Sequence, residues 1–146
     1  MRLLTVLFVL LVATAHPLAQ GRTITIGVDD SMKYSVTAIT AAPGETLKIV
    51  VKSTGSMPKL AMAHNFVLLQ LGTKADVFVK AGAMHRETDF IAPADKGKVI
   101  AATALAGAGE TVEVTFTVPQ AKGVYPYVCT FPGHFALGMK GTLTVK

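Results

Sequence analysis

Short segments in which apolar and polar residues alternate cover most of the chain after residue 20. They constrain its fold more than any other feature. The segment 111–118, TVEVTFTV, alternates almost without a break, and 46–52, TLKIVVK, is similar. A period of two residues is typical of a β-strand with one buried face. Because Gly, Pro and Asp separate the segments, the pattern predicts an antiparallel β-sandwich or barrel.

The same pattern predicts about eight strands and one helical interruption. Alternation fails between residues 73 and 84, where TKAD (73–76) resembles a weak capping box, so we expect a short helical flap outside the sheets. Neither an internal repeat nor a linker divides the sequence. Strands are expected over 23–28, 35–40, 46–52, 65–71, 99–106, 111–118, 124–129 and 141–146.

The first 20 residues have the features of an export signal. Arg2 precedes an apolar run over residues 3–12, and small residues follow, with cleavage expected after Ala15 or nearer Gln20. No later segment is apolar over enough residues to span a bilayer. We therefore expect an exported protein with a signal peptide, 1–20, and one domain, 21–146.

The charge of the chain argues against a nucleic-acid partner. There are 14 Lys and Arg residues against 9 Asp and Glu, which gives a net charge of +5. The basic residues are scattered singly, whereas a nucleic-acid-binding surface usually clusters them. A solvated basic surface is the simpler interpretation.

Three potential metal donors lie close together near the C-terminus: Cys129, His134 and Met139, in the segment 127–139, YVCTFPGHFALGM. A thiolate, an imidazole and a thioether are donors that copper prefers. Cys129 is the only cysteine, so an internal disulfide does not account for it. A blue-copper site needs a second imidazole. His64 is the candidate, because the loops at one end of a Greek-key sandwich converge.

The segments around these residues closely resemble azurins, which are bacterial cupredoxins that carry electrons in the periplasm. The resemblance lies in 62–68, MAHNFVL, in 129–134, CTFPGH, and in 139–145, MKGTLTV, and weaker similarity covers nearly the whole chain after the leader. It implies a cupredoxin-type Greek-key β-sandwich holding one type 1 copper ion. The implied equatorial ligands are His64, Cys129 and His134, and the implied axial ligand is Met139.

The resemblance also implies how the surroundings of the metal are built. The backbone amides of Asn65 and Phe131 are expected to point at the Cys129 sulfur, and the Asn65 side chain is expected to join the two ligand loops. The Ala63 carbonyl would be a distant fifth contact. An exposed apolar ring around the edge of His134 would form a contact surface. Its expected members are Met32, Leu60 and Met62 together with part of the apolar run Phe131, Pro132, Gly133, Phe135, Ala136 and Leu137.

The sequence departs from azurins at three points. Four residues separate His134 from Met139 where azurins have three, a spacing closer to plastocyanin and auracyanin, so the axial geometry does not carry over. The azurin disulfide is absent because there is no second cysteine. Phe66 replaces the core tryptophan.

We expect a monomeric, periplasmic electron carrier rather than an enzyme, with no stable membrane insertion. Its partners would be redox proteins such as c-type cytochromes or terminal reductases and oxidases. The edge of His134 would be the exit for electrons. Copper storage or delivery without redox traffic is the alternative, and reversible one-electron cycling with retained copper would separate the two.

Two other kinds of site remain open at this stage. Zinc also binds Cys and His, although structural and catalytic zinc sites do not normally use methionine such as Met139. Alternatively, Cys129 could be a nucleophile paired with His134 and oriented by Asn65, but the apolar loop leaves a substrate little room. His16 and His85 receive no role.

Overall fold

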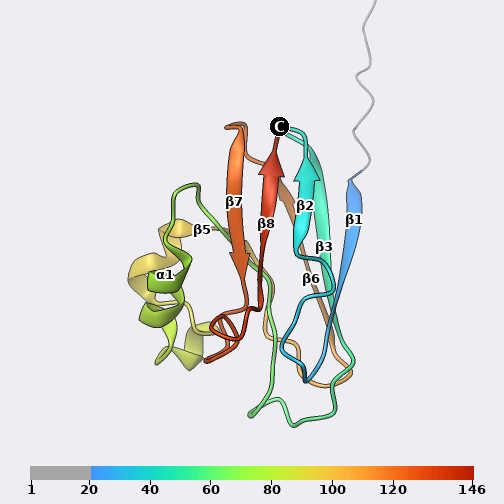
Figure 1. Ribbon diagram of the computed structural model, residues 1–146, viewed down its shortest axis with the longest axis vertical. Coiled ribbons are helices and arrows are strands. Elements are labelled where there is room, and N and C mark those ends of the chain that lie inside the picture. The colour runs from blue at the N-terminus through green and yellow to red at the C-terminus, as the bar shows by residue number, and fades with distance from the viewer. Residues whose placement is uncertain (1–20) are drawn as a thin grey trace, which may run out of the picture.

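The computed structural model describes residues 21–146, and the predicted signal peptide, 1–20, lies outside the described residues. Eight strands form two sheets that pack face to face (Figure 1). This confirms the predicted all-β sandwich. The three-stranded sheet has the order β1 (Arg22–Val28), β3 (Thr46–Ser53), β6 (Thr111–Thr117). The five-stranded sheet has the order β2 (Ala38–Ala41), β8 (Lys140–Val145), β7 (Gly123–Val128), β4 (Val67–Leu69), β5 (Val99–Ala102).

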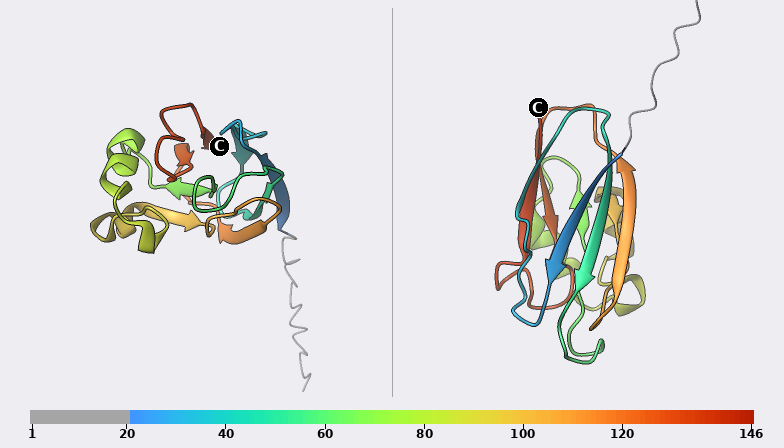
Figure 2. Two further views of the ribbon diagram at one scale, coloured as in Figure 1. Left: turned by 90° about the horizontal axis from the view of Figure 1, so that it is seen from below. Right: turned by 90° about the vertical axis from the view of Figure 1, so that its right-hand side faces the viewer.

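The two sheets enclose one main core. In β3, Leu47, Ile49 and Val51 are fully buried while the residues between them are partly exposed, as the period of two predicts. They pack with buried side chains of the other sheet, among them Tyr127 and Leu143. The right-hand view of Figure 2 shows the three-stranded sheet in front, with the second sheet behind it.

Three predicted strands are shorter than expected, two of them because side chains take over backbone bonds. Residues 35–37 do not join β2, since the Ser35 amide and hydroxyl bond the Gly27 backbone of the opposite sheet. β5 stops at Ala102 because the Thr103 hydroxyl accepts the bond from the Phe66 amide at 3.0 Å. β4 is also limited to three residues.

The predicted helical flap is present, as α1 (Ala75–Gly82), followed by the 3-10 turns η1 (Arg86–Thr88) and η2 (Pro93–Lys98). It lies to one side of the sandwich (Figure 2, left). Phe78 anchors it, because this side chain is buried against Val67, Leu69 and Val128. The predicted capping box is wrong: the residue preceding the helix is Lys74, and no side chain caps it. Within residues 21–146, no helix has the length and apolarity needed to cross a membrane.

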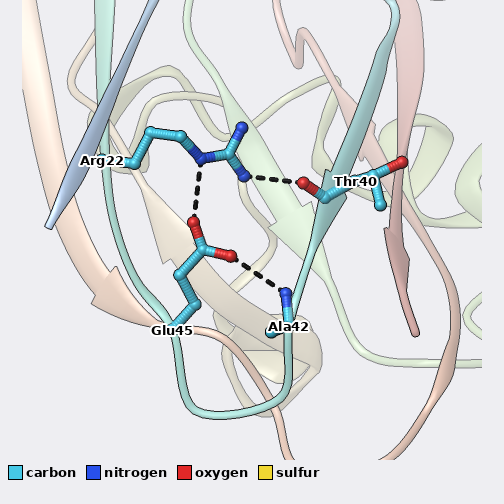
Figure 3. A network of polar contacts seen from close by, with 4 residues as sticks. All are labelled: Arg22, Thr40, Ala42 and Glu45. Carbon is cyan, nitrogen blue, oxygen red and sulfur yellow. Dashed lines mark hydrogen bonds and ion pairs between the residues drawn. The ribbon is translucent and has the colours of Figure 1, made fainter. Parts of the chain in front are cut away.

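A polar network ties the two sheets together at the end where β3 begins. Arg22 of β1 bonds the Glu45 carboxylate at 2.8 Å and the Thr40 carbonyl of β2 at 2.6 Å (Figure 3). The second oxygen of Glu45 accepts a bond from the Ala42 amide at 2.9 Å. The β7–β8 loop lies at the opposite end of the sandwich (Figure 1), so this network holds the fold without touching that loop.

Candidate metal centre

Three buried donors converge at one end of the sandwich. The donor atoms of His64, Cys129 and His134 all lie within 4.8 Å of one another, and none of the three residues is more than 2% exposed. The Cys129 sulfur is 3.5 Å from Nδ1 of His134, and the centres of the two imidazole rings are 4.9 Å apart. The structure therefore brings together two imidazoles and the thiol that were predicted from distant parts of the sequence.

Backbone bonds fix the positions of these donors. His64 precedes β4 and is held by a two-way bridge to Ala106, with bonds of 2.9 and 2.7 Å. Cys129 directly follows β7, and its amide bonds the Met139 carbonyl at 3.2 Å. The Met139 amide bonds the His134 carbonyl at 3.0 Å. The loop between β7 and β8 is thus closed on itself by its own backbone.

Met139 lies at the closure of this loop. It is fully buried and packs in the same core cluster as Cys129. Gly133 and Gly138 have φ values of +87° and +94°, which favour glycine and let the chain turn directly before His134 and directly before Met139. A thioether is therefore available in the same core cluster as the thiol.

The imidazole of His64 lacks the partners that a buried polar ring normally has. Both of its ring nitrogens are buried and neither makes a hydrogen bond. Leaving such groups unpaired is costly, and each case in a native structure needs an explanation. A metal ion bound to one of the two nitrogens would give that nitrogen its partner. The residues present therefore fit a metal such as copper, which accepts imidazole and thiolate donors.

Burial and hydrogen bonds set the protonation of the donors. Burial lowers the pKa of His134 to about 4, helped by the neighbouring His64, and burial also lowers the pKa of His64. Both rings are therefore neutral at neutral pH and have a lone pair to donate. Burial raises the pKa of the Cys129 thiol to about 11. The backbone amides of Asn65 and Phe131 bond the sulfur and oppose this rise, because they lower the pKa. A bound cation would favour the thiolate.

A side-chain clasp joins the two loops that carry the donors. The Thr130 amide donates to Oδ1 of Asn65 at 2.9 Å, and Nδ2 of Asn65 donates to the Thr130 hydroxyl at 2.8 Å. The hydroxyl also donates to the Asp89 carbonyl at 2.6 Å, so the flap is tied to the same point. The role of Asn65 was expected. The role of Thr130 was not, and its position directly after Cys129 was the only available signal.

The apolar ring expected around His134 is present but covers the imidazole more than expected. Leu60 and Leu137 are 75% and 52% exposed, and Met32 and Met62 are half-buried. His134 itself is only 2% exposed, because the Phe131 ring packs on it with ring centres 4.8 Å apart. Electrons or ligands must therefore reach the imidazole through its apolar neighbours.

The remaining histidines lie away from this cluster. Nδ1 of His85 contacts the Glu87 carboxylate at 3.1 Å in the flap. His16 lies outside the described residues. Within residues 21–146, His64, Cys129 and His134 are the one group of metal-binding side chains that converges.

Comparison with known proteins agrees with the fold and the donor set. The family model described as "Copper binding proteins, plastocyanin/azurin family" matches residues 22–146. The chain is 36% identical to azurin from Pseudomonas aeruginosa, with 100% of this chain and 99% of that protein covered. It is 38% identical to auracyanin-B from Chloroflexus aurantiacus over 80% of this chain, and it spans 48% of that protein.

Solved structures of similar proteins share the architecture. The "blue" copper protein auracyanin A from Chloroflexus aurantiacus superimposes with a TM-score of 0.74 at 36% identity, which covers 87% of this chain and all of that one. A two-sheet β-sandwich with a buried cluster of two imidazoles and one thiol defines a cupredoxin-type copper protein. The chain belongs to the plastocyanin/azurin family of copper-binding proteins. The resemblance predicted from the sequence is confirmed, and so is copper as the cofactor.

Proposed function

We propose that the protein is a periplasmic electron carrier whose single type 1 copper ion is bound by His64, Cys129, His134 and Met139. The observation that carries this proposal is the unpartnered, buried imidazole of His64, which lies within 4.8 Å of the other two donors. Bound copper supplies a one-electron couple between Cu(I) and Cu(II). The donor set of thiolate, imidazole and thioether suits both oxidation states.

The residues of the site keep the donors in place during electron transfer. The two-way bridge of His64 to Ala106 and the bonds that link Cys129, His134 and Met139 leave little freedom to rearrange. The amides of Asn65 and Phe131 bond the sulfur of Cys129 and withdraw electron density from it, which helps to set the reduction potential. Burial of all donors excludes water from the site.

The same burial favours a carrier over an enzyme or a copper-delivery protein. A substrate needs access to the reacting group, and a copper chaperone needs a route for the ion, but the three converging donors are at most 2% exposed. An electron can cross the apolar cover without such a route. We therefore propose no catalytic residue and keep copper storage or delivery as the second candidate.

The proposed cellular setting follows from the leader and the surface. The export signal predicted in residues 1–20 and the similarity to azurin support a periplasmic location. The exposed apolar residues Leu60 and Leu137 beside the loop of His134 support docking to larger redox proteins. We propose c-type cytochromes or terminal reductases and oxidases as these partners, with the carrier acting as a monomer.

Copper loading tests the site directly. Purified protein given Cu(II) should develop an intense visible absorption from thiolate-to-copper charge transfer. Cys129→Ser should abolish the absorption, as should His64→Gln, whereas the matched variant His85→Gln should keep it, because His85 lies outside the cluster. A colourless one-to-one copper complex of the wild-type protein would contradict the proposed type 1 site.

Electrochemistry then separates the two candidate functions. An electron carrier should show a reversible one-electron wave, and copper should remain bound through repeated cycles. A protein that releases copper on reduction, or that cycles irreversibly, would favour storage or delivery instead.

A further inference from the structure

A hollow of about 250 Å³ opens beside the metal centre, between the flap and the loop that leads to His64. We call it the socket, and its principal residues are Lys59, Leu60, Arg86, Phe90, Leu105 and Phe131. We propose that the socket receives an apolar side chain of the redox partner, flanked by a carboxylate that pairs with Arg86. This inference rests on the proposed electron-carrier function and names the chemistry of the partner surface.

The wall of the socket is held in an unusual backbone conformation. Asp89 and Phe90 have φ values of +52° and +60°, which are rare and costly for non-glycine residues. Surrounding bonds hold them there: the Phe90 amide donates to the His85 carbonyl at 2.8 Å, and Thr130 donates to the Asp89 carbonyl. Gly82 makes room, since a Cβ there would lie 1.9 Å from the Phe90 carbonyl oxygen. The socket is therefore formed before any partner arrives.

The floor of the socket leads directly to the metal donors. The Phe90 ring packs edge-on against Phe131 with ring centres 5.3 Å apart, and Phe131 packs on His134 at 4.8 Å. The Phe131 amide also bonds the Cys129 sulfur. An occupant that touches Phe131 is separated from His134 by one aromatic ring. Since His134 is only 2% exposed, this is a short path by which a partner can approach it.

Arg86 supplies the charge that selects the occupant. Its Nη2 donates to the Leu60 carbonyl at 2.9 Å, and its guanidinium lies 5.9 Å from the centre of the Phe90 ring. No carboxylate among residues 21–146 forms an ion pair with it, whereas Lys59 is paired with Glu110 at 2.7 Å. The guanidinium thus keeps donors free for a carboxylate, and Arg binds carboxylates through two parallel bonds.

The lining of the socket suits one anchoring side chain. Apolar groups of Leu60, Leu105 and the two phenylalanines surround it, and Asp89 is its one acidic residue. Anchors of this kind, an apolar side chain in a pocket with an arginine beside it, commonly dominate the binding energy of an interface. A carboxylate on the partner completes the pairing that the chain itself leaves open.

The probe for this chemistry is 3-phenylpropionate, which combines a phenyl ring with a carboxylate. Titrated into the copper(I)-loaded protein, it should cause saturable NMR shifts in Leu60, Phe90 and Leu105, which line the socket and not the hollow around Lys80. The uncharged analogue 3-phenylpropanamide should bind roughly threefold to tenfold more weakly, because it lacks the charge-assisted bonds. Arg86→Gln should remove that preference and Arg86→Lys should retain part of it. The matched control Lys80→Gln should leave it unchanged, since Lys80 lines a different hollow.

Two outcomes would overturn the proposal. One is a set of shifts that maps to Leu137 or to the hollow around Lys80, or no saturable shift at all. The other is a preference for the carboxylate that survives Arg86→Gln in a variant whose spectrum shows an intact fold. Colour after reoxidation to Cu(II), and reversible cycling, measured on the same preparations, test the electron-carrier function separately. A blue, reversibly cycling protein that does not bind the probe would rule out the socket as a partner-binding site and leave the proposed electron-carrier function standing.

Discussion

Tyr127 and Gly141 lie directly opposite each other in the ladder between β7 and β8, and the tyrosine ring fills the space where a Cβ of residue 141 would be. A Cβ built at Gly141 would lie 2.2 Å from Cζ of Tyr127. The ring cannot move aside easily, because the Tyr127 hydroxyl donates to the Val36 carbonyl at 2.7 Å and the residue is fully buried. This contact holds β7 in place against β8 at a point two residues before Cys129.

We expect Gly141→Ala to destabilise the protein by roughly 1–3 kcal/mol, the usual range for an overpacked site that is forced to shift. Guanidinium unfolding of the copper-free protein would measure the loss. The matched control is Gly97→Ala, where a Cβ meets nothing within 4 Å and φ is not positive. That change should be neutral or slightly stabilising. Equal effects of the two variants would contradict the proposed tight contact.

The clasp between Asn65 and Thr130 gives a second prediction. Asn65→Ala leaves the buried Thr130 amide without its acceptor, so we expect a loss of roughly 2–3 kcal/mol in unfolding free energy and a changed visible spectrum. Thr130→Val should also weaken the fold, since it removes the bonds to Asn65 and Asp89. Thr130→Ser keeps the hydroxyl and should lie close to wild type. If Ser and Val behaved alike at this position, the hydroxyl would not be the clasp.

Most of the sandwich could be predicted from the sequence because alternate residues of each strand are buried in the same core. β1, β3, β6, β7 and β8 lie within one residue of the expected limits at each end. β2 and β5 differ because Ser35 and Thr103 make side-chain bonds that compete with the ladder. Alternation carries no information about such competition.

The candidate donors could be chosen from residue type and local spacing, but their supporting contacts could not. Thr130 bonds Asp89, 41 residues away, and the Asp89–Phe90 corner adopts positive φ angles that these residue types rarely take. Neither feature leaves a pattern in the sequence. The one-residue-longer loop before Met139 was visible, but its closure onto Cys129 and His134 required the structure.

The link between Arg22 and Glu45 predicts a dependence of stability on pH. The bond from Arg22 is the main cause that lowers the pKa of the Glu45 carboxyl below its usual 4.5. A carboxyl group whose pKa is lower in the folded than in the unfolded state stabilises the fold at pH values above its unfolded-state pKa. This stabilisation is lost as the pH falls through its folded-state pKa. Glu45→Gln should cost about 0.5–1 kcal/mol at neutral pH, and the difference should shrink below about pH 4.

The more exposed pair of Lys48 and Glu113 is the control for this experiment, because its carboxylate side chain is 57% exposed against 25% for Glu45. Glu113→Gln should have a smaller effect on the free energy of unfolding, because solvent screens this pair more strongly. Unfolding curves at several pH values would test both variants. A Glu45→Gln effect that stayed constant into the acid range would assign its cost to something other than the charge.

The buried thioether of Met139 predicts a shift in reduction potential. We expect Met139→Leu to keep copper, because the other three donors remain, and to raise the potential, since loss of a sulfur donor penalises Cu(II) more than Cu(I). Voltammetry of the copper-loaded variant measures this shift. Met84→Leu, at a site that is 89% exposed in the flap, is the matched control and should leave the potential unchanged. Complete loss of copper from Met139→Leu would make this residue a primary ligand instead.

Leu137 is exposed near the end of the loop between β7 and β8, which allows the exit route of electrons to be tested. If electrons leave through the apolar surface beside His134, Leu137→Lys should slow electron self-exchange, because two copies must then desolvate and juxtapose added charges. NMR line broadening in mixtures of oxidised and reduced protein measures the rate, and the visible spectrum should stay the same.

Val124→Lys is the matched control, since Val124 is equally exposed, at 53% against 52%, but lies at the opposite end of β7. Both variants add one positive charge, so the comparison cancels the effect of net charge at a given ionic strength. A clear reduction for Leu137→Lys alone would place the exit at this surface, and equal rates for the two variants would exclude it.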